Sequence, residues 1–156
     1  MIYVHTANIV VLSNYWQEKL QPIIGDCTII NNPIDPNITI DDSISRKPKQ
    51  LLLLGRPDPV KGHSFAFDIA RRLQKEGWEL VATGTEHSEA GIKGLGWVSE
   101  QEKLRLLQES TAMLIPSKFE GQPLVMLEAL AAGCSVIASD KIPELPPCVT
   151  SATHED

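Results

Sequence analysis

The sequence predicts an α/β protein with a Rossmann-like doubly wound parallel sheet. Short runs of leucine, isoleucine and valine alternate along the chain with stretches of helical periodicity, which is the pattern of repeated βαβ units. The run LLLL at 51–54 is too short for a helix and too apolar for an edge strand, so we expect it at the centre of the sheet. No internal repeat interrupts the alternation. One α/β domain over residues 1–156 is therefore expected.

The composition is that of an ordinary globular protein of 156 residues, with 42% hydrophobic and 22% charged residues. Its net charge of −6 argues against nucleic acid as a partner. Cys27, Cys134 and Cys148 contain no C-x-x-C pair, which fits a reducing compartment rather than a disulfide framework or a zinc site. No run approaches the ~18 apolar residues of a transmembrane helix, and no signal peptide opens the chain. We expect a cytoplasmic protein, with the full-length form peripheral at the inner membrane face.

A strand–helix–strand unit is predicted near the N-terminus. IVVL at 9–12 is a β-branched run, Ser13 and Asn14 suit the cap of a helix at 15–20, and TIIN at 28–31 is a second strand. Residues 36–50 are polar and include prolines, so they are expected to form an exposed linker.

The second part of the chain continues the alternation. Phe67, Ala70 and Leu73 share one face of a predicted helix, and a capping box at 99–102 opens the next one. The expected elements are a strand at 51–54, a helix at 63–76, strands at 79–84 and 92–98, a helix from 99 to about 110, a strand at 112–116, a helix at 123–132 and a strand at 135–138.

The stretch SKFEGQPLVMLEALAAG at 117–133 joins a polar loop to a very apolar helix. Pro123 suits the first helical turn, and Gly133 suits a left-handed cap. Glu128 is out of place inside this helix, because an unpaired carboxylate in apolar surroundings is costly; it needs a neighbouring donor or a ligand. The residues expected to pack on the sheet are Leu124, Leu127, Ala131 and Ala132.

The start of this helix is suited to a phosphate, because it offers free N–H groups and a partial positive charge. Glu128 lies about 8 Å further along the axis and leans back toward the helix start, within reach of a ribose. Glu120, in the loop, faces the other side of a diphosphate, where a sugar would lie. A single sugar-nucleotide site accounts for both acids.

Further candidate residues come directly after predicted strands, and the carboxyl ends of parallel strands share one rim where ligands bind. Arg56 and Lys61 in GRPDPVKGH suit a diphosphate, because arginine offers a bidentate fork and lysine a point charge. A solvated basic loop is the alternative. The other residues at strand ends are Gly84, Thr85, Trp97, Val98 and Lys118.

The string IPSKFEGQPLVMLEALAAGCSVIASD, with its Glu-x7-Glu spacing, resembles the donor-site signature of the retaining glycosyltransferases of family 4. GRPDPVKGH is similar to the family's GR-x(n)-KG motif. The resemblance runs from about Ile9 to Glu144. It implies a GT-B fold, of which this chain is the C-terminal, nucleotide-sugar-binding half. It also implies a nucleoside diphosphate sugar as the donor substrate, with no metal or other cofactor.

The resemblance implies roles for single residues. Arg56, Lys61 and Glu120 are the implied catalytic residues, since the two cations hold the donor phosphates and Glu120 contacts the sugar. Trp97 and Val98 resemble a G-x-V turn that reads the base, with a plain core position as the alternative for Trp97. The implied donor-binding residues are Gly55, Gly84, Thr85, Trp97, Val98, Lys118, Gly121, Gln122, Pro123, Leu124 and Glu128.

The sequence departs from the family pattern after Glu120. The family often has Gly-Phe-Gly there, whereas Gln122 and Pro123 follow Gly121 here, which leaves the bound hexose open. Glu144 matches a family position near the donor. No metal site is predicted, because the histidines are scattered, and His63 is expected at the surface. The histidines are His5, His63, His87 and His154.

The resemblance implies transfer of a sugar from a nucleoside diphosphate sugar to a sugar, glycan or lipid-linked acceptor. The family's acceptor-binding N-terminal domain, in cis or in trans, and its final helices are expected outside this chain. Two alternatives stay open. One is another GT-B enzyme, such as a sugar-nucleotide epimerase, and the other is a non-catalytic partner subunit of a split glycosyltransferase.

Overall fold

A parallel six-stranded sheet with the strand order β5-β4-β3-β6-β7-β8 forms the body of the computed structural model, which describes residues 8–153. This confirms the predicted parallel α/β sheet with the leucine run near its centre. His5 and His154 lie outside the described residues. The strands of this sheet are β3 (Lys47–Leu53), β4 (Glu79–Ala82), β5 (Ile92–Gly94), β6 (Ser110–Ile115), β7 (Ser135–Ser139) and β8 (Thr150–Ala152).

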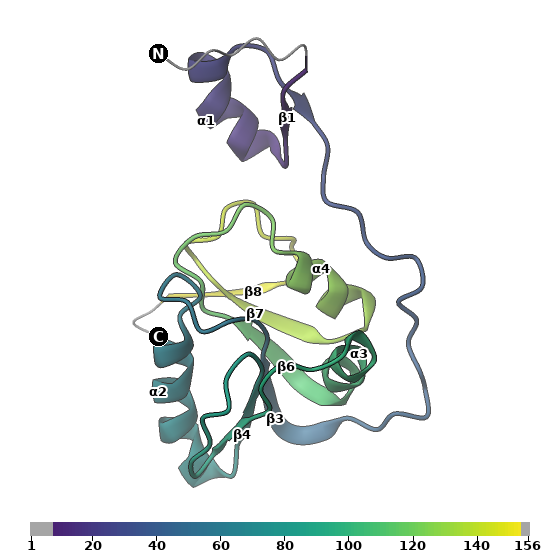
Figure 1. Ribbon diagram of the computed structural model, residues 1–156, viewed down its shortest axis with the longest axis vertical. Coiled ribbons are helices and arrows are strands. Elements are labelled where there is room, and N and C mark those ends of the chain that lie inside the picture. Colours follow the sequence, from purple (N-terminus) through teal and green to yellow (C-terminus); the bar gives the residue numbers. More distant parts are fainter. Residues whose placement is uncertain (1–7, 154–156) are drawn as a thin grey trace.

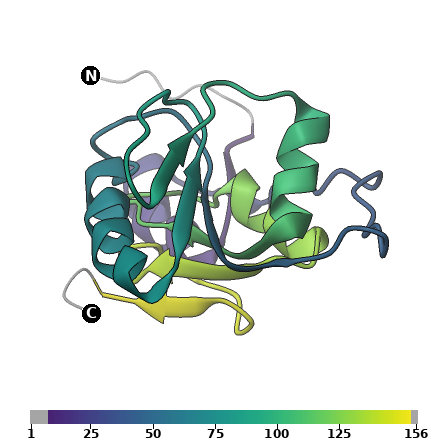
Figure 2. The same cartoon turned by 90° about the horizontal axis from the view of Figure 1, so that it is seen from below.

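Helices cover both faces of the sheet, as a doubly wound fold requires (Figures 1 and 2). Leu51 and Leu53 point to the α2 side, whereas Leu52 points to the side of α3 and α4. Successive side chains of a strand face opposite ways. Along β6, Leu114 therefore packs on the α2 side of the sheet, and Met113 packs on the side of α3 and α4. The helices are α2 (His63–Leu73), extended by a 3₁₀ turn (Gln74–Glu76), α3 (Glu100–Glu109) and α4 (Leu124–Ala131).

Helix α4 buries only part of the predicted face, because Leu127 packs partly buried against the core and Ala132 is buried. Met126, Ala129 and Ala132 are buried, whereas Leu124 is 50% exposed. Pro123 precedes the helix in an extended conformation instead of lying in its first turn. The prediction failed in part, because almost every residue of this helix is apolar, so the periodicity marks no single face. The predicted position of Ala132 is correct.

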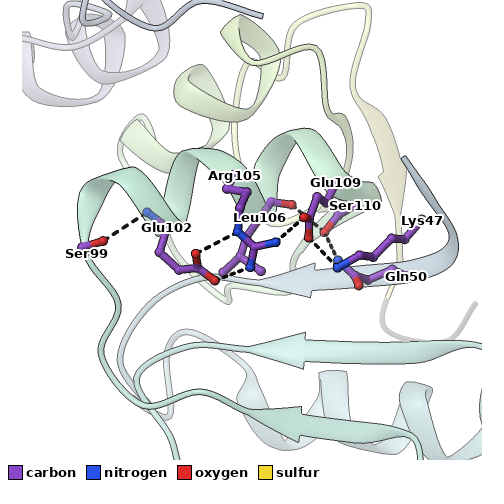
Figure 3. A network of polar contacts seen from close by, with 8 residues as sticks. All are labelled: Lys47, Gln50, Ser99, Glu102, Arg105, Leu106, Glu109 and Ser110. Carbon is purple, nitrogen blue, oxygen red and sulfur yellow. Dashed lines mark hydrogen bonds and ion pairs between the residues drawn. The ribbon is translucent and has the colours of Figure 1, made fainter. Parts of the chain in front are cut away.

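Helix α3 is fastened to the start of β3 by the polar network in Figure 3. The Ser99 hydroxyl accepts from the Glu102 amide at 3.1 Å, which confirms the predicted cap. The Arg105 side chain lies between Glu102 and Glu109, and its hydrogen bond holds the pKa of the Glu102 carboxyl below its usual value. The network ends at β3, where the Lys47 ammonium lies 2.6 Å from the Glu109 carboxylate.

The predicted linker at 36–50 is shorter than expected, because Lys47–Gln50 already belong to β3. Its remaining part is mostly exposed but is held against α3. The Gln108 side chain donates to the carbonyl of Thr39 at 3.0 Å and accepts from the amide of Asp41 at 2.7 Å. Arg46 also donates to the carbonyl of Ser110 at 2.8 Å. The linker is therefore tethered along its course.

The first strand–helix–strand unit forms a separate two-stranded parallel sheet instead of joining the large one. In Figure 1 it lies at the top, and the linker descends along one side to β3. Its elements are β1 (Val10–Val11), α1 (Asn14–Ile24) and β2 (Thr28–Ile29). At the other end of the chain, β8 was not anticipated, since a short Thr-Ser-Ala edge strand lacks the apolar run that marks a buried one.

Candidate functional site

Glycines at the carboxyl ends of β3, β4 and β5 bring three predicted turns together. The Gly84 amide donates to the carbonyl of Gly96 at 2.7 Å, and the Gly96 amide donates to that of Thr85 at 2.7 Å. A Cβ atom on Gly84 would lie 2.2 Å from the carbonyl oxygen of Gly55, so no larger residue fits there without a backbone shift. The predicted residues Gly55, Gly84 and Thr85 therefore meet at one rim.

The loops that follow β3 and β6 are joined at the same rim. The Lys118 amide donates to the carbonyl of Val60 at 2.8 Å. The Lys61 ammonium lies 2.7 Å from a carboxylate oxygen of Glu120, and the Ser117 hydroxyl donates to that oxygen at 2.8 Å. Two residues 59 positions apart in the chain thus form a partly buried ion pair. The prediction that Lys61 and Glu120 converge is confirmed.

Arg56 and the Lys118 side chain reach outward from these loops. The Arg56 side chain is 72% exposed, and its nearest carboxylate is Asp58 at 3.9 Å. The Lys118 side chain is exposed as well. Both residues stand at the rim, but among the described residues no contact joins either side chain to Lys61 or Glu120. They are available to an incoming anion.

Glu128 has the neighbouring partner that its apolar flanks demanded. Its carboxylate lies 3.0 Å from the ammonium of Lys103, which also pairs with Glu100 at 2.6 Å. Lys103 is in the first turns of α3, just after Trp97 and Val98. The ion pair thus brings Glu128 to the side of the rim where the predicted base-reading turn lies.

The turn before α3 presents one apolar side chain to solvent and one to the core. Trp97 is 77% exposed, so its core alternative is wrong, whereas Val98 packs partly buried against the core below α3 and α4. An exposed indole at a strand end is a surface on which a planar ring can stack.

His63 is buried, contrary to its predicted place at the surface. It is 6% exposed because it is the first residue of α2 and lies against Phe67, with ring centroids 6.1 Å apart. Its Nε2 lies 3.2 Å from the carbonyl oxygen of Gly55, and since a carbonyl only accepts, Nε2 carries the proton. The buried Nδ1 has no hydrogen-bond partner among the described residues. Burial lowers the pKa of His63.

This pKa shift predicts a loss of stability on acidification. The unfolded chain takes up a proton at His63 near its ordinary pKa of about 6.5, whereas the folded chain takes it up only at lower pH. The contribution of neutral His63 to the free energy of unfolding is therefore fully present above about pH 6.5. It is lost as the pH falls from there toward the pKa of His63 in the folded chain. Urea unfolding should be measured at pH 7.5 and at pH 5.5. Between these two values the free energy of unfolding should fall less for His63→Gln, which retains a donor toward Gly55, than for the wild type. The exposed His87, changed to Gln, serves as the comparison, and an equal drop in wild type and His63→Gln would refute the assignment.

The loop after Glu120 contacts the unit at 9–32, which the sequence did not indicate. Gln122, predicted to bind the donor, uses its side-chain oxygen to accept from the backbone amide of Asn32 at 2.6 Å. The Trp16 indole donates to the carbonyl of Gly121 at 3.2 Å. Glu144, predicted near the donor, accepts from the Tyr15 amide at 2.9 Å. No periodic pattern in the sequence marks such distant contacts.

No group of three or more histidine, cysteine, aspartate or glutamate residues within 8–153 is arranged to hold a metal. In the same residues, no helix is long and apolar enough to cross a bilayer.

Comparison with known proteins gives a family match. The family model of the group 1 glycosyl transferases matches residues 48–153, which include the six-stranded sheet and the rim. A similar protein is the amylovoran biosynthesis glycosyltransferase AmsK of Erwinia amylovora, which is 28% identical to this chain over an alignment 163 residues long. The alignment covers 86% of this chain and 40% of AmsK. The chain thus spans less than half of this relative.

Solved structures share the fold. The crystal structure of TarM superposes with a TM-score of 0.78 at 16% identity, covering 96% of this chain and 34% of TarM. That of the pneumococcal O-GlcNAc transferase GtfA, in complex with UDP and GlcNAc, gives 0.73 at 21% identity, covering 86% of this chain and 30% of GtfA. These likenesses confirm the predicted Rossmann-like half of a GT-B fold.

Proposed function

This chain belongs to the family of group 1 glycosyl transferases, and we propose that it is the donor-binding, C-terminal half of a retaining GT-B enzyme of family 4. Its substrate would be a nucleoside diphosphate sugar. The observation that carries the proposal is the contact between Lys61 and Glu120, which joins the two loops that resemble the family's donor motifs. The family match favours neither the epimerase nor the non-catalytic subunit.

In the proposed reaction, the diphosphate lies at the start of α4, where free N–H groups and the helix dipole favour an anion. Arg56 and Lys61 stabilise the negative charge that develops as the diphosphate departs. Glu120, held by Ser117, orients the sugar, with Gly121 allowing close approach of the backbone. The cations and helix start take the place of a metal ion in neutralising the phosphates, so we propose metal-independent chemistry.

On the other side of the diphosphate, Glu128 would bind the ribose hydroxyls. A ribose hydroxyl can donate to its carboxylate while Lys103 holds that carboxylate in place. The base would lie against Trp97 and the backbone at Val98. Gly55, Gly84 and Thr85 line the approach. A Cβ atom on Gly55 would meet nothing within 4 Å, so this glycine leaves room for the donor, whereas Gly84 lets the two turns meet.

The remainder of the enzyme enters only as a proposal, because the chain spans 40% of AmsK. The acceptor would be a sugar, a glycan or a lipid-linked sugar, bound by an N-terminal domain in cis or in trans. By analogy with a relative named for amylovoran biosynthesis, the reaction would serve polysaccharide assembly in the cytoplasm, with the whole enzyme peripheral at the inner membrane face.

The donor site can be tested by calorimetric titration of UDP, GDP and ADP into the protein. Glu128→Ala removes the proposed ribose contacts, so we expect its affinity for the preferred nucleotide to fall about tenfold. Glu79→Ala, at the opposite end of the sheet, is the control and should bind as wild type does. Absence of binding at millimolar nucleotide, or equal affinity in Glu128→Ala, would contradict the proposed function.

A further inference from the structure

We infer that Trp16 and Asn32 are positioning residues that hold the loop at 119–122, so that the site around Glu120 is complete only when the unit at 9–32 is docked. Glu120 is held by Lys61 and Ser117 on one side of this loop. The unit at 9–32 holds the following two residues on the other side. The inference rests on the proposed function for the meaning of Glu120, but its contacts stand on their own.

Trp16 fixes the backbone next to Glu120. Its indole N–H donates to the carbonyl of Gly121 at 3.2 Å, and its ring meets that of Phe119 edge to face, with centroids 5.5 Å apart at 69°. A Cβ atom on Gly121 would lie 3.3 Å from a methyl group of Leu12, so the loop lies directly against the unit. Trp16 thus contacts residues on both sides of Glu120.

Asn32 fixes the next residue through two hydrogen bonds. The backbone amide of Asn32 donates to the side-chain oxygen of Gln122 at 2.6 Å. The side-chain NH2 of Asn32 donates to the backbone carbonyl of Gln122 at 2.9 Å. A pair of bonds between the same two residues restrains both the position and the rotation of the loop. The side-chain oxygen of Gln122 is therefore engaged by Asn32.

Glu144 sets the orientation of the helix that carries Trp16. Ser13, at the N-cap of α1, makes no side-chain cap of its own, and the Glu144 carboxylate accepts from the Tyr15 amide instead. A carboxylate at a helix start is stabilised by the helix dipole and free N–H groups. Hydrogen bonds from Ser13 and Tyr15 hold the pKa of Glu144 below its usual value. Because Glu144 follows β7, this contact ties α1 to the main sheet.

The inference is tested by amide hydrogen exchange at 117–123 in the nucleotide-free chain. The double variant Trp16→Phe, Asn32→Ala removes two donors toward the loop while keeping an aromatic ring beside Phe119. We expect exchange at 117–123 to become at least about fivefold faster, as the loss of one hydrogen bond implies. Asn31→Ala is the matched control, because its side chain donates only within the unit, to Leu12, and the loop should exchange as in wild type.

A merely structural effect would raise exchange throughout the chain, so β3 and β6 serve as an internal reference. If the double variant does not fold, Gln122→Ala and Gln122→Glu replace it. Glutamate keeps an oxygen for the Asn32 amide and should restore slow exchange, whereas alanine should not. Loop exchange equal to wild type in the double variant, or equal exchange in the two Gln122 variants, would overturn the inference.

The link to the donor site has its own measurement. The double variant should weaken binding of the nucleoside diphosphate sugar more than binding of the nucleoside diphosphate alone, because only the sugar contacts Glu120. A parallel loss for both ligands would overturn this part. If wild type binds no nucleotide at all, the proposed function fails, while the exchange experiment still decides whether Trp16 and Asn32 hold the loop.

Discussion

Gly62→Ala is expected to destabilise the protein by roughly 2–5 kcal/mol and to abolish nucleotide binding at the rim. Gly62 has φ of +72° and ψ of 27°, in the left-handed region that disfavours a side chain. A Cβ atom there would also lie 2.3 Å from the carbonyl oxygen of Pro116. The clashing oxygen belongs to the backbone of Pro116, at the start of the loop that carries Glu120. We therefore expect the clash to push that loop away from Lys61.

Gly77→Ala separates the clash from the backbone strain. Gly77 adopts nearly the same conformation, with φ of +83° and ψ of 20°, but its nearest neighbour is the flexible Lys49 side chain at 3.9 Å. It should therefore cost only about 1–2 kcal/mol in urea unfolding and leave nucleotide affinity unchanged. If both variants lose the same free energy of unfolding, the close approach of the two loops is not what Gly62 provides.

Lys61→Ala is expected to raise the Kd for a nucleoside diphosphate between about tenfold and a hundredfold. The variant removes a cation proposed to contact the phosphates. It also leaves the Glu120 carboxylate without its counterion, close to where the phosphates bind. Adding Glu120→Gln to Lys61→Ala removes that repulsion, so the double variant should bind more tightly than Lys61→Ala alone.

Calorimetry at two salt concentrations measures this effect, because a lost phosphate contact also lowers the salt dependence of binding. Lys75→Ala, an exposed lysine just after α2, removes the same charge far from the rim and should bind as wild type does. Equal affinity in Lys61→Ala and Lys75→Ala would show that Lys61 only holds Glu120.

Local patterns were enough to predict the sheet and much of the rim. The run at 51–54 marked a central strand, and the strand-end rule placed Lys61 and Glu120 together although they are 59 residues apart. The rule works because every strand of the large sheet runs in the same direction, so each following loop arrives at the same edge.

Contacts without a repeating pattern stayed out of reach. Trp16 and Gly121 are 105 residues apart, and Asn32 and Gln122 are 90 apart, with no periodicity linking them. The buried face of α4 was predicted poorly for a different reason. Almost every residue of this helix is apolar, so the sequence does not distinguish one face from another. The burial of His63 depends on how the start of α2 meets Gly55, which only tertiary packing determines.

The stretch at 33–46, between the unit at 9–32 and β3, has a consequence for concentrated solutions. It contains no helix or strand, so the unit before it is joined to the main sheet by chain rather than by shared secondary structure. The loop at 119–122 of a second copy would offer Trp16 and Asn32 the same partners, namely Phe119, Gly121 and Gln122. The tether favours the contacts within one molecule, because it imposes a high local concentration of the two partners. Shortening this stretch would therefore shift the protein toward an intertwined dimer in which each copy completes the other's rim.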